Sequence, residues 1–180
     1  MKKPALLICC LLSSLCAFRA QAQIQIAATI GPQIPVGEFG EVFKPGIGFT
    51  ATGRYLIKEK FAVGLNIGYS GFGVKDLDDY KASFVPVTVL AEYHLDLGKV
   101  KPYGGMEMGL YRYRVSYKSG SIKETSTETY FGIAPTIGAT YKLTPKFALL
   151  ANLKYHNIVG DEESSGAYVG LNFGAQYSIK

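Results

Sequence analysis

The sequence predicts an all-β protein: an eight-stranded antiparallel up-and-down transmembrane β-barrel that follows a cleaved signal peptide. Three observations predict it. Apolar and polar residues alternate with period two in eight segments, which is the pattern of a β-strand with two different faces. The connections between these segments are short and long in turn, and aromatic residues lie near both ends of the apolar faces. The 180 residues suit one domain, and we assign 23–180 to the barrel.

The first 22 residues have the composition of a secretory signal peptide. A short basic segment (1–3) precedes an apolar segment (5–15) that is too short to span a membrane as a helix. Residues 20–22 form a small-x-small cleavage site, so we expect export through the Sec pathway and a mature protein that begins at Gln23.

Removal of this segment changes the chemistry available to the mature protein. All three cysteines leave with it, which excludes a disulfide framework, a thiol nucleophile and a cysteine metal site. The remaining 16 basic and 14 acidic residues give a net charge near +2. No basic stripe remains, so the sequence excludes a nucleic-acid partner.

Four strands are predicted in the first half of the barrel. From 24 to 34 isoleucine and alanine alternate with glutamine and threonine, and from 47 to 55 apolar residues alternate with glycine, threonine and arginine. Residues 61–70 repeat the pattern with glycine and asparagine between the apolar positions. Residues 85–95 carry valine at every second position in their first half. Each segment therefore has one apolar and one polar face.

The second half repeats this arrangement, with one irregular strand. Residues 131–141, 147–156 and 169–179 alternate regularly, whereas the segment 103–118 changes parity. Its apolar positions are Met106, Met108 and Leu110 on one face, then Tyr111, Tyr113, Val115 and Tyr117 on the other. A β-bulge near Gly109 would explain the change. A strand that rises above the bilayer would explain it equally.

The connections orient the barrel. Short connections are expected at 58–60, 96–101 and 142–146, and long hydrophilic loops at 37–46, 73–82, 119–127 and 158–166. In membrane barrels short turns face the periplasm and long loops face the exterior. Both ends of the barrel domain then lie on the periplasmic side.

Alternation alone does not show which face meets lipid, because a soluble lipocalin-like barrel has the same period. The predicted strands contain six charged residues: Arg54, Glu92, Glu107, Arg112, Arg114 and Lys154. The other polar positions are mostly glycine, threonine, asparagine, serine and alanine, which suit a cramped interior rather than a wetted surface.

The aromatic residues of the apolar face point to the same orientation. Those near the turns are Tyr55, Phe61, Tyr93, Tyr141, Phe147 and Tyr177, and those near the long loops are Phe49, Tyr69, Phe131 and Tyr155. Two aromatic belts around an aliphatic band match the two headgroup regions of a bilayer. The apolar face is therefore predicted to contact lipid. A soluble barrel would instead gather Leu65, Val87, Ile137 and Leu171 in one interior.

From Ile24 to Ile179 this pattern resembles the small outer-membrane β-barrel family, which includes OmpX-type barrels and the membrane domain of OmpA-type proteins. The C-terminal residues Asn172, Gly174, Tyr177 and Ile179 resemble the β-signal read by the outer-membrane assembly machinery, although Lys180 stands where an aromatic would end it. The resemblance implies a monomer in the Gram-negative outer membrane. Its partners would be the bilayer, lipopolysaccharide and the assembly machinery.

The interior charges are the candidate site. Arg54, Glu92 and Glu107 lie near the turn end of their strands, and Lys154 lies further up. The position of Arg112 depends on the bulge. Charges in a narrow lumen must pair, so we predict an ion-pair network that fills it, similar to the interior networks of OmpA-type barrels. The alternative is that these charges gate a narrow pore for ions or small solutes.

No catalytic, metal or cofactor site is predicted. His94 and His156 lie in opposite halves of the barrel, and the acidic residues near Asp76 are those of a solvated loop rather than a cation site. His156 could meet Ser164 and Asp161, but no oxyanion-hole signature accompanies them. The sequence thus predicts a non-enzymatic structural or interaction protein of the envelope, with four surface loops. The alternatives are the narrow pore and, of another class, a membrane-embedded lipid hydrolase or acyltransferase.

Overall fold

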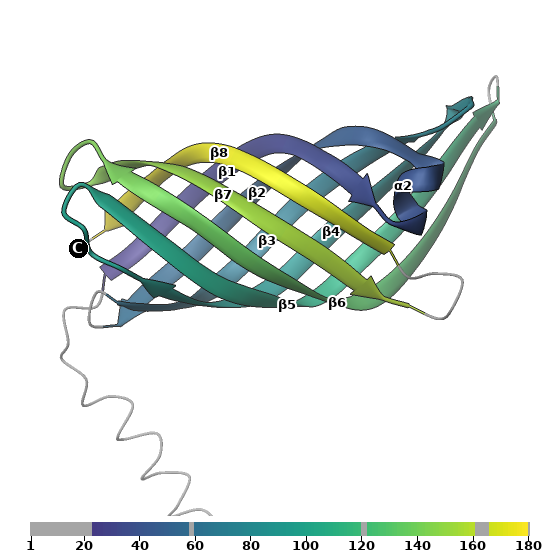
Figure 1. Ribbon diagram of the computed structural model, residues 1–180. Helices are drawn as coiled ribbons and strands as arrows, with labels where there is room; N and C mark the ends of the chain where they lie inside the picture. The colour runs from purple at the N-terminus through teal and green to yellow at the C-terminus, as the bar shows by residue number, and fades with distance from the viewer. Residues whose placement is uncertain (1–22, 58–59, 120–121, 161–165, 180) are drawn as a thin grey trace, which may run out of the picture.

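The computed structural model describes residues 23–57, 60–119, 122–160 and 166–179, which form one closed antiparallel barrel of eight strands (Figure 1). Strands that follow each other in the sequence pair with each other, and the first pairs with the last. The predicted fold class is therefore confirmed. The predicted signal peptide lies outside the described residues.

The strands are long and consecutive, and one short helix accompanies them. They are β1 (Gln23–Val36), β2 (Phe43–Ile57), β3 (Phe61–Val74), β4 (Leu77–His94), β5 (Val100–Ser119), β6 (Ile122–Lys142), β7 (Phe147–Val159) and β8 (Gly166–Ile179). The helix α2 (Glu38–Val42) lies between β1 and β2 at the loop end. Among the described residues, no helix has the length and apolarity needed to cross a bilayer.

The seam between β1 and β8 closes the barrel. Ile24 lies opposite Ile179, and the antiparallel register continues to Val36 opposite Ala167. Hydrocarbon offers no hydrogen-bond partner to an open strand edge, so a sheet in lipid must close on itself.

Between the two aromatic belts, the apolar face of each strand points away from the barrel axis. Leu65 and Ile137 are each 63% exposed, Val87 is 51% exposed and Leu171 is 38% exposed. The soluble alternative, which would gather these four side chains in one interior, is therefore wrong. The inward positions between them carry buried glutamine, threonine and asparagine side chains.

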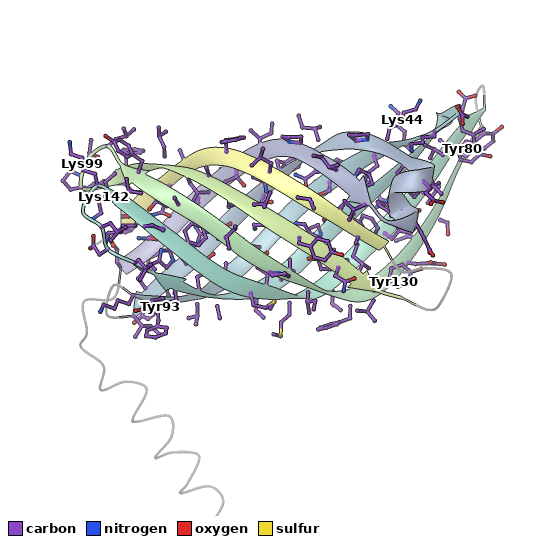
Figure 2. All side chains as sticks on the ribbon, viewed as in Figure 1. Lys44, Tyr80, Tyr93, Lys99, Tyr130 and Lys142 are labelled. Atoms are coloured by element: carbon purple, nitrogen blue, oxygen red, sulfur yellow. The ribbon has the colours of Figure 1, made fainter. Side chains whose placement is uncertain are left out.

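Aromatic pairs lie on the outer face near both ends of the lipid-facing band. At the turn end the ring centroids of Phe61 and Tyr93 are 5.0 Å apart, and those of Phe147 and Tyr177 are 4.9 Å apart. At the loop end Phe49 stacks on Tyr69 at 5.5 Å. Figure 2 shows Tyr93 at the same end as Lys99 and Lys142, with Lys44 and Tyr80 at the other.

The bulge expected near Gly109 is absent. The pairing of β4 with β5 runs without interruption from Tyr80 opposite Tyr117 to His94 opposite Tyr103. Glu107 and Tyr111 are buried, whereas Leu110 and Arg112 between and beyond them are exposed. The strand keeps one register and its surroundings change, because its upper part rises above the lipid-facing band. The parity change in 103–118 is therefore explained by a strand that rises above the bilayer and not by a bulge.

Two of the four expected long loops are mostly strand. β3 continues to Val74 and β4 begins at Leu77, and Asp76 between them adopts a φ of 60°. β5 and β6 similarly extend to Ser119 and from Ile122. As a result the ends of β4, β5 and β6 form a sheet that projects beyond the rest of the barrel (Figure 1). Cross-strand pairing satisfies backbone groups that a loop would leave to water.

A Gly174→Val substitution tests the seam. An added Cβ at Gly174 would overlap the carbonyl oxygen of Ala28 and come within 2.7 Å of Thr29 Cα, so β1 and β8 would have to separate. We expect a loss of about 1–3 kcal/mol of unfolding free energy. The measurement is urea unfolding after refolding into phospholipid vesicles, followed by heat-modifiable gel mobility.

Gly53→Val is the matched control, because a Cβ at Gly53 meets nothing within 4 Å. Its stability should stay within about 0.5 kcal/mol of the unmodified protein. Equal losses in both variants would contradict a role of Gly174 in closure.

Candidate functional site

The turn-end half of the lumen contains a buried ion pair between β2 and β4. Arg54 Nε donates to Glu92 Oε2 at 2.8 Å, and Arg54 Nη2 donates to Glu92 Oε1 at 3.2 Å. His94 Nε2 lies 3.0 Å from Glu92 Oε2. The guanidinium also lies over the Tyr103 ring, 5.6 Å from its centroid. This two-point contact fixes the orientation of both charged groups.

A second ion pair joins β5 and β7. Lys154 Nζ lies 2.6 Å from Glu107 Oε1, and Thr88 Oγ1 donates to Glu107 Oε2 at 3.2 Å. Both charged side chains are only 3% exposed. Glu107 therefore has Lys154 as its ion-pair partner, whereas the sequence analysis grouped it with Arg54.

The register explains this choice of partners. Arg54 and Glu107 belong to one row of paired residues that runs across β2, β3, β4 and β5, and Glu92 and Lys154 belong to the neighbouring row. Strands of a barrel are tilted, so a row changes depth as it passes around the wall. Each ion pair consequently links one row with the next. Arg112, the other candidate interior cation, is exposed.

Amide side chains bridge the lumen between strands. Gln33 Nε2 donates to Asn172 Oδ1 at 2.9 Å, and Asn172 Nδ2 donates to Asn152 Oδ1 at 3.0 Å. Asn152 Nδ2 in turn donates to the Tyr103 hydroxyl at 3.3 Å. Thus β1, β8, β7 and β5 are connected through the interior as well as along the wall.

An aromatic cluster lies in the loop-end half of the lumen, and sequence reasoning missed it. Its buried members are Phe72, Ala82, Phe84, Tyr111, Ile158 and Tyr168. Phe39 of α2 packs onto it, with ring centroids 5.4 Å from Phe72 and 5.7 Å from Phe84. The sequence signal that could have indicated this cluster is the run of tyrosines in 111–117, which lie on the lumen-facing side of β5.

His156 belongs to this aromatic cluster. Its ring stacks on Tyr168 with centroids 4.3 Å apart, and its Nδ1 lies 2.9 Å from the Tyr111 hydroxyl. Ser164 and Asp161, the other members of the conceivable triad, lie outside the described residues. The described part of the chain contains no group of three histidine, cysteine or acidic residues placed to hold a metal ion.

The periplasmic mouth of the lumen is a polar cavity of about 220 Å³, lined among others by Gln25, His94 and Lys142. On its rim Lys101 Nζ lies 2.8 Å from Asp96 Oδ2. That hydrogen bond, with a second from the Gly98 backbone N–H, holds the pKa of Asp96 below its usual range. The positive charges of Lys101 and Lys142 also favour the ionised form of Asp96.

The four residues of the predicted assembly signal lie on two faces of β8. Asn172 is buried in the lumen, and Gly174 faces the same way. Tyr177 and Ile179 lie on the lipid-facing side at the turn end, where Ile179 pairs with Ile24.

Comparison with known proteins shows the same architecture in several outer-membrane proteins. Neisserial surface protein A shares 20% identity and a TM-score of 0.65, over 89% of this chain and 98% of that one. The attachment invasion locus protein Ail of Yersinia pestis shares 18% identity and a TM-score of 0.56, over 88% and 97%. Likeness at these identities shows the fold alone.

Two sequence matches extend over nearly the whole chain. An uncharacterized protein of Haemophilus influenzae is 28% identical over 181 residues, which cover 96% of this chain and 99% of that one. Residues 7–178 match the family described as the outer membrane protein beta-barrel domain. The chain therefore belongs to the outer membrane protein beta-barrel family and is a barrel of the Gram-negative outer membrane.

Proposed function

We propose that this protein is a non-enzymatic outer-membrane barrel with a closed lumen, which serves the envelope through its outer surface in a structural or interaction role. The observation that supports this proposal is that buried side chains lie in both the turn-end half and the loop-end half of the lumen. The ion pairs of Arg54 with Glu92 and of Lys154 with Glu107 lie on the turn side of the aromatic cluster, which occupies the loop-end half.

Burial of these side chains supports the closed state. Tyr111 and Tyr168 have no exposed surface, and Arg54, Glu92, Glu107 and Lys154 are each at most 4% exposed. The interior of an eight-stranded barrel is just wide enough for its own side chains. An ion would have to displace paired charges and then pass an aromatic layer that offers it little solvation.

A narrow pore is the second candidate. The polar cavity at the periplasmic mouth and the charged residues above it favour this function. Conduction would require both the ion pairs and the aromatic cluster to open. For that reason we rank the pore below the closed barrel.

Planar-bilayer recording separates the two functions. We expect the purified protein to insert without steady conductance, because buried side chains lie in both halves of the lumen. Steady conductance that changes in an Arg54→Ala or Glu92→Ala variant would contradict the closed lumen and favour the pore. Heat-modifiable gel mobility of each variant checks that it is folded.

The Arg54–Glu92 pair should contribute strongly to stability. Arg54→Ala leaves the Glu92 carboxylate buried with His94 as its remaining ionisable partner, and such a loss costs about 3–5 kcal/mol. We expect the Arg54→Ala, Glu92→Ala double variant to lose less than the sum of the single variants. Urea unfolding in phospholipid vesicles measures these differences.

Arg112→Ala is the matched control for this experiment, because Arg112 is an exposed arginine of β5, the strand next to β4. Its stability should change by no more than about 0.5 kcal/mol. Additive losses in the double variant would show that Arg54 and Glu92 do not stabilise each other.

The proposed partners follow from the surface. The described strands close within one chain, so the fold needs no second copy, and we propose a monomer surrounded by lipid and lipopolysaccharide. Asn172, Gly174, Tyr177 and Ile179 are proposed to be read by the outer-membrane assembly machinery before the seam closes. Tyr177 and Ile179 lie on the outer face of the last strand, which supports their recognition.

Tyr177→Ser tests this assembly signal. We expect the amount of protein in the outer membrane to fall severalfold, while refolding of the purified variant into vesicles continues, because the assembly machinery is absent there. Tyr55→Ser is the control, since Tyr55 is also an outward tyrosine at the turn end but belongs to β2. Equal cellular loss for both tyrosines would contradict a signal in β8.

A further inference from the structure

The projecting sheet of β4, β5 and β6 has two chemically different faces. The face turned toward the barrel axis carries tyrosines, among them Tyr80 and Tyr117, whose ring centroids are 4.5 Å apart. The opposite face carries the cations Lys81, Arg112 and Arg114, all exposed. The residues paired with these cations on β4, β5 and β6 are Ser83, Val85, Ser116, Thr127 and Thr129. The outer face is therefore basic and rich in hydroxyl groups.

These cations begin where the lipid-facing band ends. Along the outer face of β5, Met106, Met108 and Leu110 are 41%, 46% and 56% exposed, and the next two outward residues are Arg112 and Arg114. The outer face of β4 changes in the same way, from Val89 and Val87 to Lys81. The long-loop end faces the cell exterior, so this change marks the headgroup level of the outer leaflet.

The cations are close enough to share one anionic group. Arg112 and Arg114 are two residues apart on one face, about 7 Å along the strand. Arg114 lies opposite Ser83, so Lys81 is its diagonal neighbour, about 7–8 Å away. Their long side chains can therefore converge on a phosphate group from three directions.

Neither arginine makes a hydrogen bond or ion pair to another residue in the described ranges 23–57, 60–119, 122–160 and 166–179. The residues paired with the two arginines are Ser83 and Val85 of β4 and Thr127 and Thr129 of β6. Asp79, two residues beyond Lys81, is the nearest described carboxylate along β4. Lys44 of β2 shares a register row with Lys81 through Gly73 and has a contact of its own.

The basic surface is confined to one side of the barrel. Outward positions near the loop end of β1, β7 and β8 carry uncharged residues, namely Ile34, Tyr155 and Val169. A general preference of cations for headgroups would distribute them around the whole barrel. Their concentration on β4 and β5, with Lys44 of β2 in the same register row, indicates a local site.

We propose that Lys81, Arg112 and Arg114 form a binding site for the phosphate groups of lipopolysaccharide. The inference rests on the proposed surface role and names its ligand. A guanidinium group can donate two parallel hydrogen bonds to two oxygens of one phosphate. The apolar band directly below the cations would contact the acyl chains of the same lipopolysaccharide molecule. The hydroxyls of Ser83, Thr127 and Thr129 supply further donors.

Titration of the folded protein in detergent micelles with rough lipopolysaccharide tests the site. The variant is Arg112→Gln, Arg114→Gln, and its matched control is Lys60→Gln, Lys99→Gln, which removes two exposed cations at the periplasmic end. Each cation near a phosphate surface contributes about fivefold in affinity, so the arginine variant should bind about 25-fold more weakly. The control should bind like the unmodified protein, and Arg112→Lys, Arg114→Lys should retain most of the affinity.

Two further ligands define the specificity. Lipopolysaccharide without its phosphates should bind the unmodified protein as weakly as intact lipopolysaccharide binds the arginine variant. Phosphatidylglycerol micelles, whose headgroups carry one phosphate each, should show a smaller loss of affinity in the arginine variant, and an equal loss there would show a general contact with anionic surfaces and overturn the site. Equal affinity of the arginine variant and the unmodified protein for lipopolysaccharide would overturn the proposal. So would an equal loss in the control, or tight binding of heparin without binding of lipopolysaccharide.

The outcome is independent of the lumen. If the unmodified protein conducts ions while the arginine variant loses lipopolysaccharide, the closed barrel is wrong and this site remains. If the lumen is closed and the arginine variant binds normally, this site alone is wrong.

Discussion

The absence of hydrogen-bond partners in hydrocarbon is the constraint on which this structure depends. Every backbone N–H and C=O within the bilayer must find its partner in the protein, and a sheet achieves this only when its first and last strands pair. The antiparallel register of β1 with β8 provides that pairing. Closure then divides the side chains of each strand into a lipid-facing set and a lumen-facing set, which is why alternation extends through the whole chain.

The small number of strands controls the interior. A barrel of eight strands leaves no space for bulk water, so polar groups that enter the lumen must find partners there. Arg54 with Glu92, Lys154 with Glu107, and the amides of Gln33, Asn152 and Asn172 meet most of this requirement. Among the described residues, Arg54 Nη1 and the amide oxygens of Gln25 and Gln176 are buried without a hydrogen-bond partner. The ion pairs and amide contacts connect strands far apart in the sequence, and in the closed barrel that we propose they would oppose the passage of ions.

The environment changes along single strands, and the pattern of side chains changes with it. On β5 the outward residues pass from methionine and leucine to Arg112 and Arg114, while the inward residues pass from Glu107 to tyrosines. Within the bilayer the apolar side faces out. Above it the outer side meets charged headgroups and water, and the inner side packs against Phe84 and Phe39. A reversal of apolar parity is thus a sign of the membrane boundary.

The sequence by itself determined the eight strands and, within the lipid-facing band, which residues face outward, because alternation depends only on neighbours along one strand. It also identified Arg54, Glu92, Glu107 and Lys154 as interior charges. It did not determine that Glu107 pairs with Lys154, since partners across the lumen depend on strand tilt and on how the register advances around the wall. The projecting sheet and the packing of Phe39 of α2 onto the aromatic cluster were likewise decided by tertiary structure, where cross-strand pairing and aromatic contacts outweigh the loop character of the local sequence.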